Sequence, residues 1–263
     1  MLSIAGLLPH PPFAIQGFNP SLDRAYASLH EAYARIGEHM QSRMIETIVF
    51  VSSHGEGYAR AFAFAQHEPA HTSLREYGTM EYEYRWRMDT RLIDAAQRAF
   101  RKADVLTTLT TNEYLDTASG VALSALRPWV ETMRVATLTL PSDAISLKRP
   151  AALLRDVIEL QPSRIAILAI ADLSHRLASK SPQGLHPDAQ ALDERIRHAL
   201  IDQNLSALRA ISQEERQELG AEEIPLVEFL LYVLSDARPH FQEWAYSHPH
   251  GIGHSVMIAD LHV

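Results

Sequence analysis

Three histidines follow three of the most apolar segments of this sequence. They are His10 after residues 4–8, His54 after residues 45–52 and His175 after residues 164–171. A strand that is buried on both faces is continuously apolar, and ligands of α/β sheets bind beyond the carboxyl ends of the strands. We therefore expect the three imidazoles to meet in one cleft at one edge of a sheet.

A carboxylate is also needed if this cleft holds a metal ion, because neutral imidazoles leave the charge of the ion uncompensated. Glu222 and Glu223 precede an apolar helix expected over residues 226–234, and either could supply it. Acidic residues also suit a first helical turn for electrostatic reasons alone. Two histidines and one carboxylate are typical of non-haem iron(II) oxygenases, and the same ligands accept zinc.

The remaining histidine would be free for acid–base chemistry, since the pKa of imidazole lies near neutrality. Asp172 stands three residues before His175 and could orient it, although an aspartate at the end of a strand is often a turn former.

Composition limits the classes of function. The net charge of −8 argues against nucleic acid as a partner, and no apolar run is long enough to span a membrane. The absence of cysteine excludes disulfides and thiolate chemistry and fits a reducing compartment. The amino terminus lacks the basic region of a signal peptide, so we expect a cytoplasmic protein. A symmetric homo-oligomer is one option for its assembly.

Hydrophobic periodicity predicts alternating strands and helices along residues 1–263, which indicates one α/β domain with a mainly parallel or mixed sheet. The expected strands cover residues 4–8, 45–52, 58–66, 105–109, 133–140, 164–171 and 252–263. The expected helices cover residues 22–41, 86–102, 120–126, 148–160, 187–219 and 226–234. Residues 76–84 are polar and aromatic without a clear period, which is typical of a loop.

Five short motifs occur in an order that resembles the catalytic subunit of class III extradiol ring-cleavage dioxygenases, the LigB-like superfamily that includes Memo-like proteins. They are PHPP at residues 9–12, SSHG at 52–55, LDTASGV at 115–121, DLSH at 172–175 and GIGH at 251–254. The resemblance covers nearly the whole chain. It implies a single α/β domain with a central mixed, largely parallel sheet flanked by helices.

The resemblance also implies residue roles. His10, His54 and Glu222 would bind Fe(II), with Glu223 as the alternative carboxylate and zinc as the alternative metal. His175 would move protons during opening of a catechol-type ring by dioxygen, with Asp172 as its neighbouring acid. Thr117 takes a substrate-contact position where this family often has histidine, which alters that contact.

The remaining histidines are given weaker roles. His186, before Pro187, is placed at the entrance of the cleft, with a loop or helix-cap role as the alternative. His248, His250 and His254 could form a second metal site, because the last two would share a face if the final segment is a strand.

Three functions are compatible with these residues. The leading interpretation is an Fe(II)-dependent extradiol dioxygenase that acts on a small aromatic substrate. A non-catalytic Memo-like protein would use the same cleft to bind a peptide or small molecule. A zinc-dependent hydrolase would use the same ligands to activate water.

Overall fold

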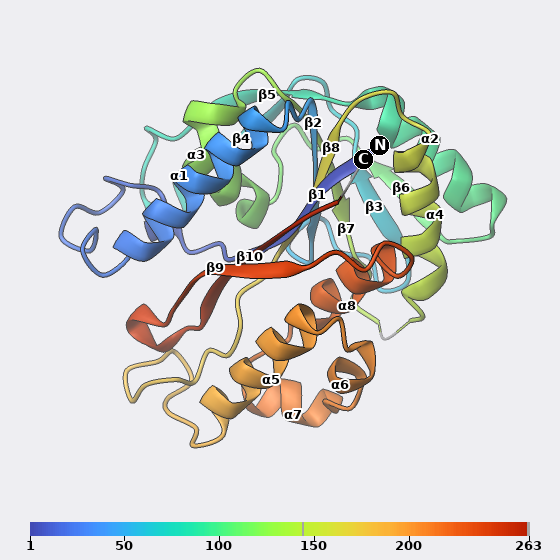
Figure 1. Ribbon diagram of the computed structural model, residues 1–263. Coiled ribbons are helices and arrows are strands. Elements are labelled where there is room, and N and C mark those ends of the chain that lie inside the picture. The colour runs from blue at the N-terminus through green and yellow to red at the C-terminus, as the bar shows by residue number, and fades with distance from the viewer. Residues whose placement is uncertain (144, 262–263) are drawn as a thin grey trace.

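A mixed sheet forms the centre of the computed structural model, which describes residues 1–143 and 145–261 (Figure 1). Its strands are β1 (Leu2–Leu8), β2 (Thr47–Ser52), β3 (Phe62–Ala65), β4 (Ala70–Thr72), β5 (Tyr84–Met88), β6 (Thr107–Thr110), β7 (Arg134–Thr139), β8 (Ile165–Ile170), β9 (Phe241–Ser247) and β10 (His254–Asp260). The strand order is β4-β5-β7-β2-β8-β1-β10-β9, and β3 pairs with β7 and β6. Neighbours from β5 to β1 are parallel, whereas β4, β10 and β9 pair antiparallel at the flanks. The predicted central mixed, largely parallel sheet is confirmed.

Helices cover both faces of this sheet (Figure 1). They are α1 (Ala27–Ser42), α2 (Thr90–Lys102), α3 (Thr117–Val130), α4 (Lys148–Glu159), α5 (Ala189–Ile201), α6 (Leu205–Arg209), α7 (Gln213–Glu218) and α8 (Ile224–Val233), with short 3-10 turns η1 (Pro12–Ala14), η2 (Arg75–Tyr77) and η3 (Pro249–Gly251). Helices α1 and α3 pack together on one face, while α4 packs between α2 and α8 on the other. Helices α5 and α6 pack against α8. Within the described residues, no helix has both the length and the apolar character needed to cross a membrane.

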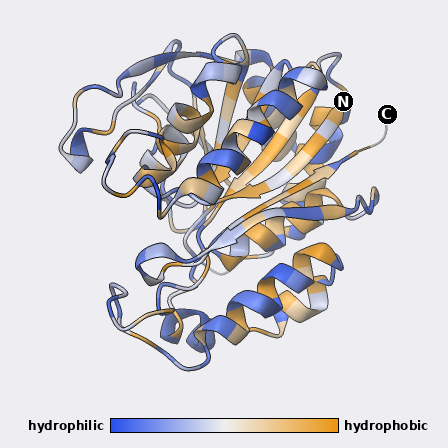
Figure 2. Cartoon of the chain, turned by 60° about the vertical axis from the view of Figure 1, so that its left-hand side comes forward, coloured by the Kyte–Doolittle hydropathy of each residue, from blue (hydrophilic) through white to orange (hydrophobic). Residues whose placement is uncertain are grey.

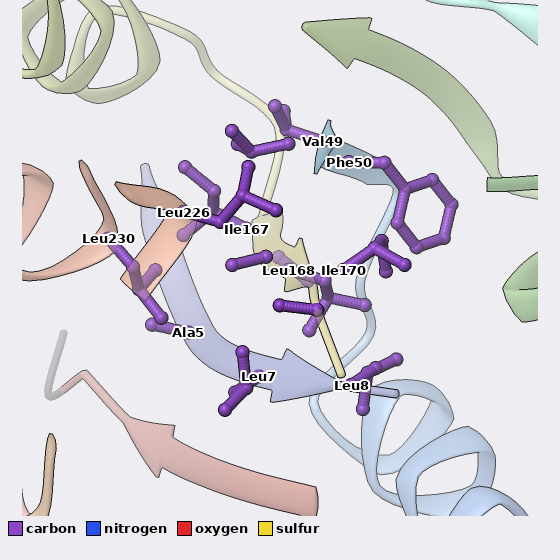
Figure 3. Packing of buried hydrophobic residues seen from close by; sticks show 14 of the residues in the cluster. Ala5, Leu7, Leu8, Val49, Phe50, Ile167, Leu168, Ile170, Leu226 and Leu230 are labelled. Carbon is purple, nitrogen blue, oxygen red and sulfur yellow. The ribbon is translucent and has the colours of Figure 1, made fainter. Parts of the chain in front are cut away.

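The core lies where the central strands meet the helices. Strand β8 is buried along its whole length, and Ile167 and Ile170 on it are inaccessible to solvent. Figure 3 shows these side chains between Phe50 of β2 and Leu226 of α8. Figure 2 shows the same pattern over the whole chain, with apolar strands inside and polar faces of helices outside. Burial of each large aliphatic side chain contributes about 1.5–3 kcal/mol, so this core stabilises the packing of the helices against the sheet.

The register of the central strands aligns their carboxyl ends. Leu8 of β1 pairs with Ile170 of β8, and Val51 of β2 pairs with Ala169 of the same strand. The segments that follow the three strands therefore begin side by side at one edge of the sheet, although about 160 residues separate the first from the last. This alignment brings the predicted site residues together.

Some elements differ from the sequence prediction. Residues 84–88 form β5 rather than the start of a helix, because Trp86 and Met88 are buried in the core while Arg85 and Arg87 are exposed. The helix begins only at Thr90, where the Asp89 side chain accepts a hydrogen bond from the Leu92 N–H.

Other differences concern the second half of the chain. Strand β9 was not predicted, and the helical region over 187–219 is divided into α5, α6 and α7. The final strand was predicted over 252–263; β10 spans His254–Asp260, and residues 262–263 lie outside the described part of the chain.

Candidate metal centre

His10 extends from the end of β1 into a stiff, proline-rich turn. Its backbone N–H donates to Asp172 Oδ1 at 3.1 Å. The buried Tyr33 hydroxyl donates to the carbonyl of Pro9, so the residue before His10 is also fixed. Pro11 and Pro12 restrict φ where η1 begins. The imidazole is thus held by a backbone that has little freedom.

His54 lies in the loop after β2, and its backbone is tied to α3. Ser52 Oγ accepts the His54 N–H at 3.0 Å and donates to Asp116 Oδ1 at 3.0 Å. Asp116 also caps α3 by accepting the Ser119 N–H at 3.0 Å. The Leu115-Asp116 motif therefore positions a histidine from another part of the chain.

Glu223 reaches the same point from the beginning of α8. Its Oε2 accepts the Asp172 N–H at 2.5 Å, and its Oε1 is hydrogen-bonded to His54 Nε2. The side chain is 13% exposed. Both oxygens of this carboxylate thus face the ends of β2 and β8.

The side chains of His10, His54 and Glu223 converge on one point. One potential ligand atom from each lies within 4.8 Å of the other two, and the two imidazole centroids are 4.5 Å apart. Two imidazoles and a carboxylate suit a divalent transition metal such as Fe(II) or zinc. The donor set therefore fits the metal that the sequence led us to expect.

Glu222, the carboxylate predicted first, does not belong to this group. It is exposed and lines the adjoining cavity, whereas its neighbour Glu223 points to the two histidines. Helix α8 begins at Ile224, and Glu223 is its N-cap residue. The turn before the helix directs the two adjacent side chains differently, so the alternative carboxylate takes the position expected for Glu222.

The carboxylates of this centre change the protonation of their neighbours. The hydrogen bond to Glu223 raises the pKa of His54 above its usual value, against the opposing effect of burial. Burial alone would raise the pKa of Asp172, but the neighbouring His10 and His254 imidazoles and their hydrogen bonds hold it well below its usual range. A proton on His54 competes with a metal ion for the same nitrogen.

A cavity of about 500 Å³ adjoins the metal ligands, and His175 lines it. The His175 N–H donates to the carbonyl of Gly220 at 3.1 Å. Gly220 adopts a φ of 63°, a left-handed conformation that favours glycine. Leu140, Pro141 and Leu226 add apolar surface to the cavity wall. His175 therefore faces the space that a substrate beside the metal would occupy.

The contacts of Asp172 differ from those predicted, which were with His175. Its carboxylate contacts His10 and His254, with Oδ1 accepting from His254 Nδ1 at 3.0 Å. Among the described side-chain hydrogen bonds, none joins it to His175. Asp172 therefore contacts the candidate metal ligand His10 and not the predicted acid–base histidine His175.

The two predicted substrate contacts lie outside the wall of this cavity. Thr117 begins α3, where its hydroxyl donates to Glu76. His186 lies in a separate surface depression, 3.4 Å from Glu218. Both predictions relied on positions in loops, whose paths a sequence does not specify.

The predicted cluster of carboxyl-terminal histidines does not converge either. His250 Nδ1 is hydrogen-bonded to the Tyr26 hydroxyl at 3.0 Å, whereas His254 contacts Asp172. His250 lies in η3, before the final strand, so it does not share a strand face with His254. The Tyr26 ring lies next to both imidazoles, but their side-chain hydrogen bonds go to different partners.

Asp193 of α5 supports the segment that carries His175, a role the sequence did not reveal. Its Oδ1 accepts the Ser174 N–H at 2.8 Å, and its Oδ2 accepts the Tyr246 hydroxyl at 2.9 Å. A Cβ on residue 253 would lie 2.0 Å from Asp193 Oδ2, so Gly253 is required for this approach. The buried Asp193 carboxyl group therefore holds the loop that carries His175.

Asp193→Asn is expected to change how stability depends on pH. Burial raises the pKa of Asp193 from 3.8 to about 6, despite the opposing hydrogen bonds from Ser174 and Tyr246 and the charges of Arg197 and His254. The unfolded chain therefore loses this proton at lower pH than the folded protein. Between pH 4 and pH 7 the free energy of unfolding of the wild type should fall by up to about 3 kcal/mol relative to that of the variant. Urea unfolding across this range measures the difference, and parallel stability profiles would contradict it.

Comparisons with known proteins show the family and the fold of this chain. The family model described as the catalytic LigB subunit of aromatic ring-opening dioxygenase matches residues 4–256. Protein CA_C1420 of Clostridium acetobutylicum is 21% identical over 261 residues, which is 95% of this chain and 56% of that protein, so the chain spans about half of that relative. The crystal structure of the uncharacterized protein JW3007 from Escherichia coli K12 is similar in fold. Its TM-score is 0.68 at 17% identity, over 99% of this chain and 100% of that one.

Proposed function

Because the chain belongs to the family of the catalytic LigB subunit of aromatic ring-opening dioxygenase, we propose that it is a non-haem Fe(II)-dependent extradiol dioxygenase. Its substrate would be a catechol-type aromatic, and its product a ring-opened semialdehyde. The convergence of His10, His54 and Glu223 beside the cavity lined by His175 is the observation that carries this proposal.

The two histidines and Glu223 would hold the iron on one side and leave other positions open to ligands. When bound, Fe(II) would supply the site for the catechol oxygens and for activation of dioxygen. The rigid turn around His10 and the hydrogen-bonded loop around His54 would keep the ligands in place without rearrangement. These contacts favour a site that is organised before the substrate binds.

His175 would accept and return protons at the catechol hydroxyl and at the opening ring. It lines the same cavity as the metal ligands but is outside their cluster, so its imidazole is free to transfer protons. Imidazole is the side chain that most often acts as a general acid and base in enzymes.

The volume and lining of the cavity support a small-molecule substrate with an aromatic ring. Its volume of about 500 Å³ is in the range of small-molecule sites, and its apolar lining includes Leu140, Pro141 and Leu226. These side chains would contact the ring while its hydroxyls point to the metal ligands. A ring with two adjacent hydroxyls could make both the apolar contacts with these side chains and the polar contacts with the metal centre.

A panel of catechols tests the proposed activity. The full-length protein would be loaded anaerobically with Fe(II), and in parallel with zinc, before air-saturated buffer and each catechol are added. We expect the absorbance of a ring-opened product to appear only with the iron-loaded protein and dioxygen. Hydrolysis of an ester by the zinc-loaded protein without dioxygen, and no turnover of catechols, would instead indicate a hydrolase. Stoichiometric iron without turnover of any catechol would contradict the proposal.

A further inference from the structure

His254 is a buried polar residue that the proposed reaction leaves without a role. It is 1% exposed at the start of β10, and its Nδ1 lies 3.0 Å from Asp172 Oδ1. Its Nε2 is also buried and has no hydrogen-bond partner among residues 1–143 and 145–261. A buried polar atom without a hydrogen-bond partner destabilises the folded protein. The hydrogen bond between His254 and Asp172 therefore has to offset the cost of burying Nε2.

Asp172 connects this histidine to the metal ligand. Its Oδ1 accepts both the His10 backbone N–H and the His254 side chain, at 3.1 and 3.0 Å. Its Oδ2 lies 3.7 Å from His10 Nδ1, a buried atom that also has no hydrogen-bond partner among the described residues. The carboxylate is thus held by two donors on one oxygen while the other faces the imidazole ring of His10.

The direction of the hydrogen bond follows from its partner. An ionised carboxylate only accepts, so His254 Nδ1 must carry the hydrogen in this contact. His10 Nδ1 lies 3.7 Å from Asp172 Oδ2 and 4.0 Å from Glu223 Oε2, so Asp172 holds His10 through its backbone N–H and places a carboxylate beside its ring. A carboxylate commonly lies beside metal-binding histidines and orients them.

We propose that His254 is a positioning residue of the metal centre, which fixes Asp172 so that this carboxylate orients the imidazole of His10. The proposal rests on the assignment of His10 as a metal ligand. It extends that assignment to a buried histidine that belongs neither to the ligand cluster nor to the residues that line the cavity. His254 of β10 thus contacts Asp172, and Asp172 contacts the proposed metal ligand His10.

Zinc affinity provides a readout that does not depend on turnover. Zinc would be titrated into the metal-free full-length protein in competition with a chromophoric chelator. His254→Leu removes the donor and should weaken zinc binding about 10- to 100-fold, the usual effect of losing an outer-shell partner. His254→Asn keeps an N–H near the position of Nδ1 and should restore the affinity to within about threefold of the wild type.

A second measurement on the wild type keeps the proposal falsifiable if His254→Leu does not fold. Nitrogen NMR of histidine-labelled, metal-free protein should show His254 with its hydrogen on Nδ1, and Asp172→Asn should shift that resonance. A hydrogen on Nε2 alone would overturn the proposal, because the contact with Asp172 would then lack a donor.

The outcomes separate this inference from the proposed function. Wild-type protein that binds zinc, together with a folded His254→Leu variant of equal affinity, would overturn the role of His254 and leave the metal site intact. Wild-type protein that binds no divalent metal would overturn both. Weaker binding in His254→Leu with rescue by His254→Asn is the result that supports the proposal.

Discussion

Glu223→Gln is expected to weaken metal binding more than any other single change outside the two histidines. The glutamine is similar in size but has no charge to balance the ion, and Glu223 is the carboxylate of the cluster with His10 and His54. The loss should exceed the 10- to 100-fold effect typical of an outer-shell partner. Metal content after dialysis and chelator competition measure it.

Glu222→Gln is the matched control for this prediction. It removes the same charge one residue earlier, from an exposed side chain outside the ligand cluster. Since isolated exposed charges contribute little, its metal affinity should stay within about threefold of the wild type. Thermal unfolding of the metal-free variants checks that both fold. Equal losses in the two variants, or a loss only in Glu222→Gln, would contradict the assignment of Glu223.

His175→Ala is expected to separate metal binding from turnover. Its imidazole lines the cavity but lies outside the metal cluster, so the variant should bind iron normally. Loss of a positioned acid–base group should lower kcat by roughly two to four orders of magnitude. Steady-state turnover with the best catechol, at matched iron content, measures the effect.

His186→Ala controls for the general effect of removing a histidine. His186 is half-buried in a different depression, beside Glu218, and it does not line the cavity of the metal centre. Its turnover should equal that of the wild type. Normal turnover in His175→Ala, or an equally large loss in His186→Ala, would contradict the proton-transfer role of His175.

The central strands and the position of the site could be predicted from the sequence because burial leaves a clear pattern. Strands β1, β2 and β8 are buried from end to end, so their apolar runs stand out. Parallel pairing then places the residues after them at one edge. The histidines His10 and His54 were found for this reason.

Elements away from the centre of the sheet were harder to predict because their pattern is mixed. Strand β9 lies at the end of the sheet, and most of its residues are half-buried. Strand β5 alternates over only five residues and directly precedes α2, so its period was not separated from that of the helix. Short alternation gives a weak signal when one face is exposed.

The finer features of the site depend on turns and long-range contacts. The choice between Glu222 and Glu223 follows from the backbone before α8, where one residue of difference changes the direction of the side chain. The contacts of Asp172 with His10 and His254 join residues 162 and 82 positions apart in the chain. Neither periodicity nor motif spacing contains this information.

Oxygen consumption by the iron-loaded protein tests the proposed function most directly. An oxygen electrode would record the dioxygen consumed per molecule of the best catechol, with the ring-opened product measured in the same sample and Glu223→Gln as the control. A dioxygenase should consume one dioxygen per product formed, without releasing hydrogen peroxide, and Glu223→Gln should consume none. Stoichiometrically metallated wild-type protein that consumes no dioxygen with any catechol, or that only reduces it to peroxide, would contradict the function proposed for the His10, His54 and Glu223 centre.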